Sequence, residues 1–482
     1  MALSEPVLRR YDLPAAAVRA ATRCRLAGDW QGACAAAGVE VDASVLAAEP
    51  RMLDDLRHLA PDLLRWHLLD GGLECARGVR LPLLLAQYPR GLALVVHCRF
   101  ETYGPHRLRL STDTAWVRSR WDSSRHLWDA RHATRLPHRL GGGDRTPGFH
   151  RDGRRLDRAD LPQTAPPRDD RAASAEWEQR LLLDDRLAGW RAAGVEIDPT
   201  VTAAFNAAGA LLPFFRMSLV VPAAWDLLGA GARSGTVLVT WLPQLPDQAL
   251  TLTLRRGAGA VLRVDRWRRA QRLPAVPETA LNLPWFVEAL RRGWLPISAV
   301  HPLVRAAMFP DAPDTAYAPA AGVRVPEGIH VQCGHRRHYV GWRDGRLAAL
   351  SHTPDDVRRE LALRALGGRS TGCLAVLDNW SARTGPLPRQ IRMVARHMLL
   401  AAGHGDVAEV HRLLDAGVDP RGVRGVQRRS LLHMAHLIGD VALIRRLRAA
   451  GVDPAVPDSH GHSALQAAQA MGASAAILSG LR

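Results

Sequence analysis

The sequence lacks lysine altogether, so all 64 of its basic residues are arginine. A Walker A loop needs a lysine on the phosphates, a protein kinase needs one on its third strand, and a Schiff-base enzyme needs an amine nucleophile. These three classes are therefore excluded. The 47 acidic residues leave a net charge of +17. Abundant arginine and alanine are also typical of a GC-rich bacterial genome, so this charge is weak evidence for a nucleic-acid partner.

Cysteine pairs and long apolar runs are also missing. The six cysteines form no C-x-x-C pair, and reduced thiols in a cytosol are the default for a chain of this length. The N-terminus carries Glu5 and Arg9 where a signal peptide needs an apolar core. The most apolar window, 211–231, is interrupted by Arg216 and Asp226. We therefore expect a soluble, cytoplasmic protein with no membrane partner.

What the sequence does contain is a period near its C-terminus. Gly405-Asp406 recurs 34 residues later as Gly439-Asp440, and Gly417-Val418-Asp419-Pro420 recurs at the same interval as Gly451-Val452-Asp453-Pro454. A third, shorter copy follows around Gly472. A repeat of about 33 residues, with two helices and a turn, is the ankyrin period.

Two motif words agree with this period. Residues 430–435, SLLHMA, resemble the ankyrin T-P-L-H-x-A box, and residues 458–465, DSHGHSAL, resemble its D-x-x-G-x-T-P-L lead-in. Residues 389–482 thus resemble the ankyrin repeat family. Because no repeat buries its apolar face alone, and only two copies are complete, this array is expected to pack against the preceding segment.

The motif residues have physical roles. We predict that Ser430 and Ser463 cap helices, that Gly439 ends a helix in the left-handed conformation, and that Asp440 caps the next helix. His433 is predicted to tie adjacent turns together rather than to bind a ligand. The apolar residues at helical spacing are expected to face neighbouring repeats, namely Leu413, Leu414, Leu443, Ile444 and Leu447.

Upstream, two regions repeat one plan of helices followed by a small antiparallel sheet. Arg186-Leu187-Ala188-Gly189 echoes Arg25-Leu26-Ala27-Gly28, and Ala193–Asp198 echoes Ala37–Asp42. We interpret this as a duplicated unit of about 150 residues. The predicted strands are 92–98, 108–110 and 116–118 in the first copy, and 236–241, 250–254 and 261–264 in the second.

The predicted fold class is a multidomain α+β protein: duplicated helix-plus-antiparallel-sheet units, followed by an all-α ankyrin repeat solenoid. The expected domains are a first unit (1–134), an Arg/Gly/Pro-rich linker contributing little to any core (135–175), a second unit (176–300), a small α+β segment (301–388) and the repeats (389–482). In the small segment we predict strands at 329–332, 339–342, 347–350 and 374–377, and a helix at 355–366.

Three patterns were weighed as sites of chemistry. Residues 368–372 match the G-x-S-x-G nucleophile elbow, but a helix precedes them and a strand is predicted to follow, which is the wrong context for a hydrolase. Cys333, His335 and His338 suggest zinc, but no second ligand pair is near in sequence, and on a strand residue 338 falls on the other face or beyond a turn. We therefore expect no metal and no cofactor.

The third pattern is His126, Asp129 and His132, which at a spacing of three residues are expected to share one polar helical face rather than to form an acid–base site. The fourteen tryptophans are dispersed, and we expect them to pack in cores and interfaces rather than to stack on nucleic acid.

The predicted function is non-catalytic protein binding, as an adaptor or a sequestering inhibitor. In the ankyrin family the turn tips and inner helices bind partners, and the arginine-rich first tip suits an acidic partner surface through forked hydrogen bonds. The candidate partner-binding residues are Arg421, Arg424, Arg428, Arg429, Asp458, His460 and His462. The alternatives are an enzyme of unrecognised family in the duplicated region and an arginine-rich nucleic-acid binder.

Overall fold

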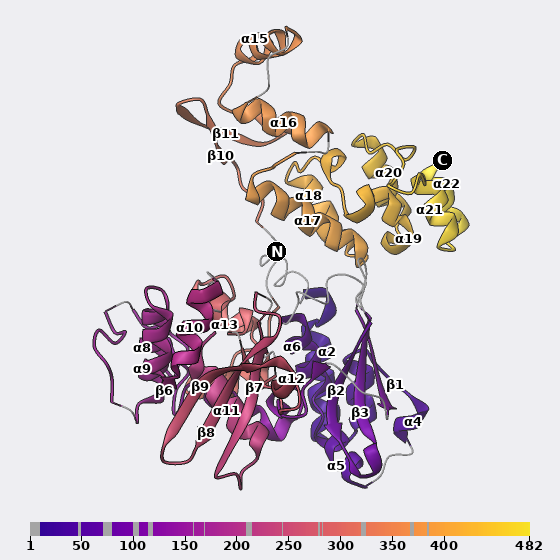
Figure 1. The fold of residues 1–482 in the computed structure, drawn as a ribbon. Helices are drawn as coiled ribbons and strands as arrows, with labels where there is room; N and C mark the ends of the chain where they lie inside the picture. The colour runs from indigo at the N-terminus through magenta and orange to yellow at the C-terminus, as the bar shows by residue number, and fades with distance from the viewer. Residues whose placement is uncertain are drawn as a thin grey trace. The chain divides into compact units, whose positions relative to one another are not determined.

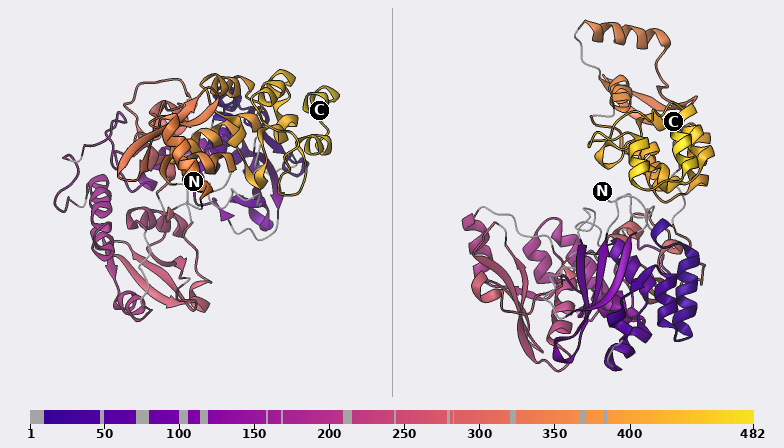
Figure 2. Two further views of the ribbon diagram at one scale, coloured as in Figure 1. Left: turned by 90° about the horizontal axis from the view of Figure 1, so that it is seen from above. Right: turned by 90° about the vertical axis from the view of Figure 1, so that its right-hand side faces the viewer.

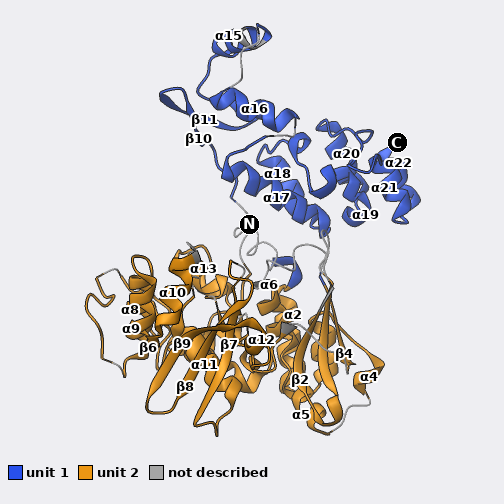
Figure 3. Ribbon diagram, in the orientation of Figure 1, with its two compact units in different colours: residues 1–12, 101–106, 320–482 blue, residues 13–100, 107–319 orange. Residues whose placement is uncertain are grey.

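The computed structural model divides the chain into two compact units (Figure 3). The C-terminal unit consists of residues 1–12, 101–106 and 320–482, and the N-terminal unit of residues 13–100 and 107–319. No helix in the described part of the chain is long and apolar enough to cross a bilayer. The described residues are 10–46, 50–70, 80–99, 106–113, 119–157, 159–167, 169–208, 215–242, 244–277, 280–281, 283–319, 324–366, 371–382 and 385–482.

The first half of the N-terminal unit packs short helices against a mixed sheet (Figure 1). Its elements are α2 (Ala15–Leu26), α3 (Trp30–Ala36), β1 (Val39–Val41), α4 (Ala43–Leu46), α5 (Pro50–His58), α6 (Pro61–Asp70), β2 (Arg80–Gln87), η2 (Pro89–Gly91), β3 (Ala93–Arg99), β4 (Arg107–Asp113) and β5 (Ser119–Arg120). The sheet order is β1-β4-β3-β2-β5, with β2, β3 and β4 antiparallel and the outer strands parallel to their neighbours. The predicted strands at 92–98 and 108–110 are confirmed, whereas 116–118 lies outside the described residues.

The second half repeats this order of elements. It contains α8 (Arg171–Leu182), α9 (Arg186–Ala192), β6 (Val195–Ile197), α10 (Pro199–Ala208), α11 (Met217–Leu228), β7 (Ser234–Trp241), β8 (Gln248–Arg255), β9 (Gly259–Arg266) and α12 (Trp267–Ala270). The sheet order is β6-β9-β8-β7, again with the short first strand parallel to the last. All three strands predicted here are confirmed.

The two halves also share a local contact. In the first, Asp42 follows β1 and forms an ion pair with Arg109 of β4. In the second, Asp198 follows β6 and pairs with Arg263 of β9, with 3.0 Å between nitrogen and oxygen. Each pair therefore fastens the short parallel strand to the last strand of the meander.

The prediction that residues 135–175 form a linker contributing little to any core is wrong for the first part of this segment. Leu136, Leu140 and Phe149 are buried in one core with Phe286 and Phe309. This arginine-rich chain can enter the interior because buried Arg139 pairs with Asp226 at 2.8 Å. The elements around this core are η3 (Arg125–Leu127), η4 (Ala130–Arg135), α7 (Leu136–Arg139), α13 (Trp285–Arg291), η6 (Ile297–Ala299) and α14 (Pro302–Met308).

The predicted boundary at residue 300 also differs from the structure, because residues 301–319 belong to the N-terminal unit. The rest of the predicted small segment lies in the C-terminal unit. It contains β10 (Ile329–Cys333), β11 (Arg336–Arg343), β12 (Arg346–Ala349), α15 (Pro354–Ala365) and α16 (Gly372–Ala382). The first three predicted strands and the helix are confirmed. The strand predicted at 374–377 is wrong: these residues lie within α16, because a four-residue apolar run fits either structure.

Three helical pairs complete the C-terminal unit (Figures 1 and 2). They are α17 (Arg389–Gly403) with α18 (Val407–Asp415), then η9 (Leu431–Met434) and α19 (Ala435–Ile438) with α20 (Val441–Ala449), then α21 (Ala464–Ala470) with α22 (Ala475–Leu481). The first helices contact one another in the order α17, α19, α21, and α20 contacts α22. The pairs are therefore stacked side by side.

The predicted helix ends are confirmed. Ser463 accepts a hydrogen bond from the Gln466 amide at 3.3 Å, and Asp440 accepts one from the Leu443 amide at 2.6 Å. Ser430 forms a capping box with His433. Gly439 adopts the left-handed conformation with φ of 65°.

The helical pairs share one apolar core with the preceding sheet. Ile329, Val340 and Trp380 are buried in the same cluster as Leu413, Leu443 and Leu447. The Trp380 indole also donates to the Asp419 carboxylate at 3.2 Å. The expectation that the array packs against the preceding segment is therefore confirmed.

A buried carboxylate lies where α17 meets α18. Glu409, 5% exposed, accepts hydrogen bonds from Arg412 at 2.6 Å and contacts the His397 imidazole at 2.5 Å. Burial alone would raise the pKa of Glu409, but Arg412 and His397 lower it to about 2. Burial also lowers the pKa of His397. Both groups therefore bind fewer protons in the folded chain than in the unfolded one.

We predict that the C-terminal unit loses stability in acid. The Glu409 contribution is present above its unfolded pKa of about 4.3 and is lost as pH falls towards 2, and it amounts to about 2 kcal/mol. His397 acts in the same direction from about pH 6.5 downwards. Urea unfolding of the full chain and of Glu409→Gln, at several pH values, measures this. Their midpoints should differ most near neutral pH and converge near pH 2; a constant difference would contradict the assignment.

Candidate functional site

The best candidate site is formed by two neighbouring loops of the helical array. The first loop, residues 420–430, contains two short 3₁₀ turns, η7 (Pro420–Gly422) and η8 (Val426–Arg428). Its tip closes with a hydrogen bond from the Gly425 amide to the Arg429 carbonyl at 2.9 Å. Within the tip, Gln427 and Arg428 both have positive φ angles, 59° and 58°. Such angles cost a residue with a side chain about 1–2 kcal/mol.

The second loop, residues 454–463, is closed by the same kind of backbone hydrogen bond. Its residues suit the turn conformation better than those of the first loop. The Asp458 amide donates to the His462 carbonyl at 2.9 Å. The Asp458 carboxylate also accepts from the amides of His460 and His462, at 2.8 and 3.1 Å. Gly461 takes the left-handed position. Matching the two closing hydrogen bonds places Gly425 where Asp458 stands and Arg428 where Gly461 stands.

The two loops are bound to each other. The Ser459 amide donates to the Gln427 carbonyl at 2.8 Å, and Arg429 pairs with Asp458 at 3.3 Å. His433 adds a third link: its Nδ1 accepts from the Ser430 amide at 3.1 Å and its Nε2–H donates to the His462 carbonyl at 3.0 Å. The prediction that His433 ties adjacent turns together is therefore confirmed.

These contacts divide the seven predicted partner-binding residues into exposed residues and residues that are hydrogen-bonded within the loops. Arg428, His460 and His462 are exposed, and no acidic group among the described residues forms an ion pair with Arg428. Arg421, Arg424 and Arg429 are half-buried and hydrogen-bonded within the loops, to Asp419, Val423 and Asp458.

The prediction that Asp458 contacts a partner has to be corrected. Its carboxylate is 5% exposed and accepts hydrogen bonds from its own loop, so a partner cannot reach it. Burial would raise its pKa, but the His462 and His460 amides and Arg429 hold the pKa below the usual value. Asp458 is therefore a structural anion of the second loop. The surface formed by Arg428, His460 and His462 is here called the loop surface.

The predicted polar face of His126, Asp129 and His132 is not a helical surface. The residues lie around η3 and η4, and Asp129 and His126 are buried. Asp129 accepts from Arg131 at 2.8 Å and pairs with Arg125 at 3.3 Å. Burial and nearby arginines lower the pKa of His126 well below its usual value. These contacts indicate a structural arginine–aspartate network.

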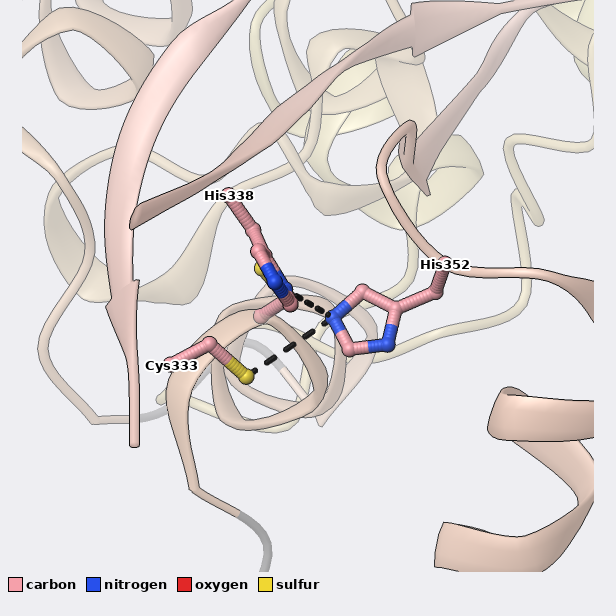
Figure 4. Close-up of side chains that lie close together, drawn as sticks. Cys333, His338 and His352 are labelled. Atoms are coloured by element: carbon pink, nitrogen blue, oxygen red, sulfur yellow. Dashed lines mark hydrogen bonds between the residues drawn. The ribbon is translucent and has the colours of Figure 1, made fainter. Parts of the chain in front are cut away.

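Four potential metal ligands from distant positions meet in the C-terminal unit (Figure 4). The donor atoms of Cys333, His338, His352 and Cys373 all lie within 4.8 Å of one another. Nδ1 of His338 is 2.8 Å from Nε2 of His352, which is 3.7 Å from Sγ of Cys333. Burial and the Cys333 thiol raise the pKa of Cys373 to about 12. This is the one such group of three or more in the described part of the chain.

His338 lies beyond the β10–β11 turn, one of the two alternatives expected from the sequence, but the inference that this separates it from Cys333 is wrong. Val331 is the cross-strand partner of His338, and Cys333 lies two residues beyond Val331. Alternation along β10 puts 331 and 333 on one face, and cross-strand partners share a face, so His338 lies on the Cys333 side. His335, in contrast, is exposed in the turn between the strands and does not belong to the group.

The structural context of the G-x-S-x-G motif remains unfavourable for a serine hydrolase. Ser370 lies outside the described residues, but α15 precedes the motif and α16 begins at its last glycine, Gly372. A nucleophile elbow needs a strand before the serine. The motif therefore gives no support to a hydrolase.

A cavity of about 1020 Å³ lies in the N-terminal unit. Arg154, Arg155, Arg180 and Arg291 line it, together with apolar residues such as Leu290. None of the six histidine, cysteine and aspartate residues weighed as catalytic or metal-binding lines this cavity. The cavity therefore gives no support to an enzyme that uses those histidine and acidic residues.

A group of arginine and tryptophan residues lies at the end of β7 and at residues 266–272, at and after the end of β9. Trp241 is 43% exposed, its indole fixed by a hydrogen bond to the Pro246 carbonyl at 3.1 Å, and its ring lies 6.4 Å from that of Trp267. Four exposed arginines without ion-pair partners among the described residues flank Trp267, namely Arg266, Arg268, Arg269 and Arg272. We call these six residues the basic aromatic patch.

Comparisons with protein-family models, curated proteins and solved structures give no match for this chain. The resemblance of residues 389–482 to ankyrin repeats therefore depends on the motif residues and on the contacts that they make.

We predict that two substitutions in the loops affect stability differently. Asp458→Ala removes two hydrogen bonds to backbone amides and should lower the free energy of unfolding by about 1–3 kcal/mol. Arg428→Gly removes the backbone strain of a side-chain-bearing residue in the left-handed conformation. It should leave the free energy of unfolding unchanged or raise it by up to about 1 kcal/mol. Thermal unfolding by calorimetry measures both. A clear loss of stability in Arg428→Gly would show that its side chain is structural, contrary to our assignment.

Proposed function

We propose that this protein is a non-catalytic binding protein that holds another protein, through an acidic patch on that partner, at the loop surface. The observation that carries the proposal is Arg428, which is exposed and held in a left-handed conformation that glycine would adopt more easily. Strained residues of this kind persist where the surrounding structure over-determines them, often at binding sites. The backbone conformation of Arg428 therefore carries a cost in stability that glycine would avoid.

The arrangement of the array supports this proposal. Stacked helical pairs give a rigid base, and the hydrogen bonds between the loops fix the positions of Arg428, His460 and His462 before any partner arrives. A pre-organised surface loses less side-chain and loop entropy on binding. The ankyrin-like sequence motifs favour the same use of the loops, because in that family the tips contact partners.

The charge of the loop surface favours an acidic partner. Arg428 offers a planar fork of donors that matches a carboxylate, and the two exposed histidines add positive charge when protonated. Asp419 and Asp458, the acidic residues that contact the loop arginines, accept hydrogen bonds from Arg421 and Arg429. An adaptor and a sequestering inhibitor are both compatible with this surface.

We further infer that the two halves of the N-terminal unit are copies of one ancestral unit. The shared strand order, with the short strand parallel to the last one, supports this inference beyond the sequence echoes. The matching pairs Asp42–Arg109 and Asp198–Arg263 support it as well. Two related units give the chain a second potential binding surface besides the loop surface.

The binding proposal predicts that charge reversal at the loop surface strongly reduces capture of its partner. Immobilised full-length protein is compared with a triple variant, Arg428→Glu, His460→Glu and His462→Glu. Quantitative mass spectrometry of the captured proteins should show a specific set, with acidic surfaces, reduced about tenfold or more in the variant.

The matched control is Arg392→Glu, an exposed arginine on α17. It should capture the same set as the unchanged protein. Deleting residues 389–482 is unsuitable, because Ile329, Val340 and Trp380 would lose their core. Equal capture by the triple variant and the unchanged protein would place the site elsewhere.

Nucleic-acid binding is a second candidate, favoured by the basic aromatic patch. Exposed aromatic rings among arginines suit single strands, because bases stack on the rings and the cations neutralise phosphates. In this patch Trp241 is exposed, Trp267 is half-buried with its ring tilted by 56° to that of Trp241, and the arginines have no acidic partner among the described residues.

This second candidate predicts salt-dependent binding of single strands. Fluorescence anisotropy with a labelled single-stranded oligonucleotide measures affinity over a range of salt. Replacing Arg268 and Arg269 by Gln should reduce the slope of log affinity against log salt by about 0.7 for each phosphate that is no longer neutralised. Trp241→Ala should weaken binding by about 1–3 kcal/mol at one salt concentration. Arg191→Gln, on α9, is the control; absence of salt-dependent binding would reject the candidate.

A further inference from the structure

We propose that Cys333, His338, His352 and Cys373 bind a single zinc ion that stabilises the sheet of the C-terminal unit. This proposal is independent of the loop surface and of what binds there. It concerns two thiol and two imidazole donors that are up to 40 residues apart in sequence and meet at one point.

The spacing of the donors fits a tetrahedral zinc site. Zinc–sulfur bonds of about 2.3 Å and zinc–nitrogen bonds of about 2.0 Å give donor–donor edges of about 3.3–3.8 Å. The distances here, 2.8 Å between the two histidine nitrogens and 3.7 Å between Cys333 and His352, lie close to that range. Small side-chain rotations would complete the tetrahedron. In Figure 4 the side chains of Cys333, His338 and His352 point towards one another.

Three pieces of local structure bring the donors together. The register of β10 and β11 places Cys333 and His338 on one face. The turn after β12 is held by a hydrogen bond from the Tyr339 amide to Ser351 Oγ at 2.9 Å, which positions His352 next to it. At Gly372 a Cβ atom would lie 2.6 Å from the Cys333 sulfur, so glycine is required for α16 to bring Cys373 this close.

The donor chemistry selects the metal. Two thiolates and two imidazoles in a tetrahedral arrangement are typical of zinc. Because all four positions are taken by protein ligands, no open position remains for a substrate or an activated water, so the site is structural. Two thiolates also neutralise the two positive charges of the ion, which makes a half-buried site tolerable.

The structure gives the ion a clear mechanical task. The sheet has only three strands, of five, eight and four residues, and small sheets of this kind are often stabilised by added cross-links. A zinc ion would join the β10–β11 hairpin, the turn at His352 and the start of α16. Since α16 also carries Trp380, which packs on the helical array, the ion would tie the sheet to the array.

The test uses the full-length chain with zinc and cobalt as probes. Purified protein should contain one zinc per chain by mass spectrometry of the metal. Replacing zinc by cobalt should give the visible bands of a tetrahedral site and a thiolate charge-transfer band. Hydrogen exchange in peptides covering 329–353 and 371–382 should become faster after chelation, while peptides of α21 and α22 change less.

Matched variants assign the ligands. Cys333→Ser, Cys373→Ser, His338→Gln and His352→Gln should each weaken zinc binding by about 100-fold or more, since loss of a group that merely orients a metal ligand already costs about 10- to 100-fold. His335→Gln, in the same hairpin but outside the group, should bind like the unchanged protein. If the single variants fail to fold, Cys333→His keeps four donors and should retain zinc with a weaker thiolate band in the cobalt form.

Several results would overturn the proposal. The first is a folded chain that binds neither zinc nor cobalt when reduced. The second is a disulfide between Cys333 and Cys373 in the native protein that persists when zinc is offered under reducing conditions. The third is loss of zinc in His335→Gln equal to that in His338→Gln.

Discussion

The shared apolar core of the C-terminal unit is the constraint on which the rest of this unit depends. Three helical pairs are only the minimum number that such an array needs, and a three-stranded sheet is small for an independent core. Together they form one cluster running from Ile329 and Val340 through Trp380 to Leu443 and Leu481. The positions of the proposed binding residues in the two loops follow from that cluster, because these loops begin and end on helices that it fixes.

The buried carboxylates discussed above follow one pattern of pairing. Carboxylates that lie inside, such as Asp129, Glu409 and Asp458, are occupied by arginine, histidine or backbone amides. This is expected, because a buried carboxylate without partners costs several kcal/mol. Many remaining arginines therefore face solvent without acidic partners, as Arg428 and Arg268 do among the described residues. The exposed positive charge is thus a consequence of how the acidic residues are paired inside, as much as of the net charge.

Local sequence signals predicted local structure well. Hairpin strands, helix caps and the left-handed Gly439 were all predictable, because turn chemistry and side-chain alternation act within a few residues. Predictions failed where apolar residues were diluted by charge, as between Leu136 and Phe149, and where a short apolar run fitted two structures, as at Leu374. The candidate metal centre was missed because its four donors are distant in sequence, and the face of His338 depends on pairing between strands.

The sequence by itself determined the period of the helical array, the positions of most strands and the exclusion of lysine-dependent chemistry. These follow from residue type and spacing alone. Only the tertiary structure decided which loop residues are exposed, that Asp458 serves its own loop, and that Cys333, His338, His352 and Cys373 meet. The physical reason is that burial, ion pairing and metal-ligand geometry depend on contacts between residues far apart in the chain, which no local pattern specifies.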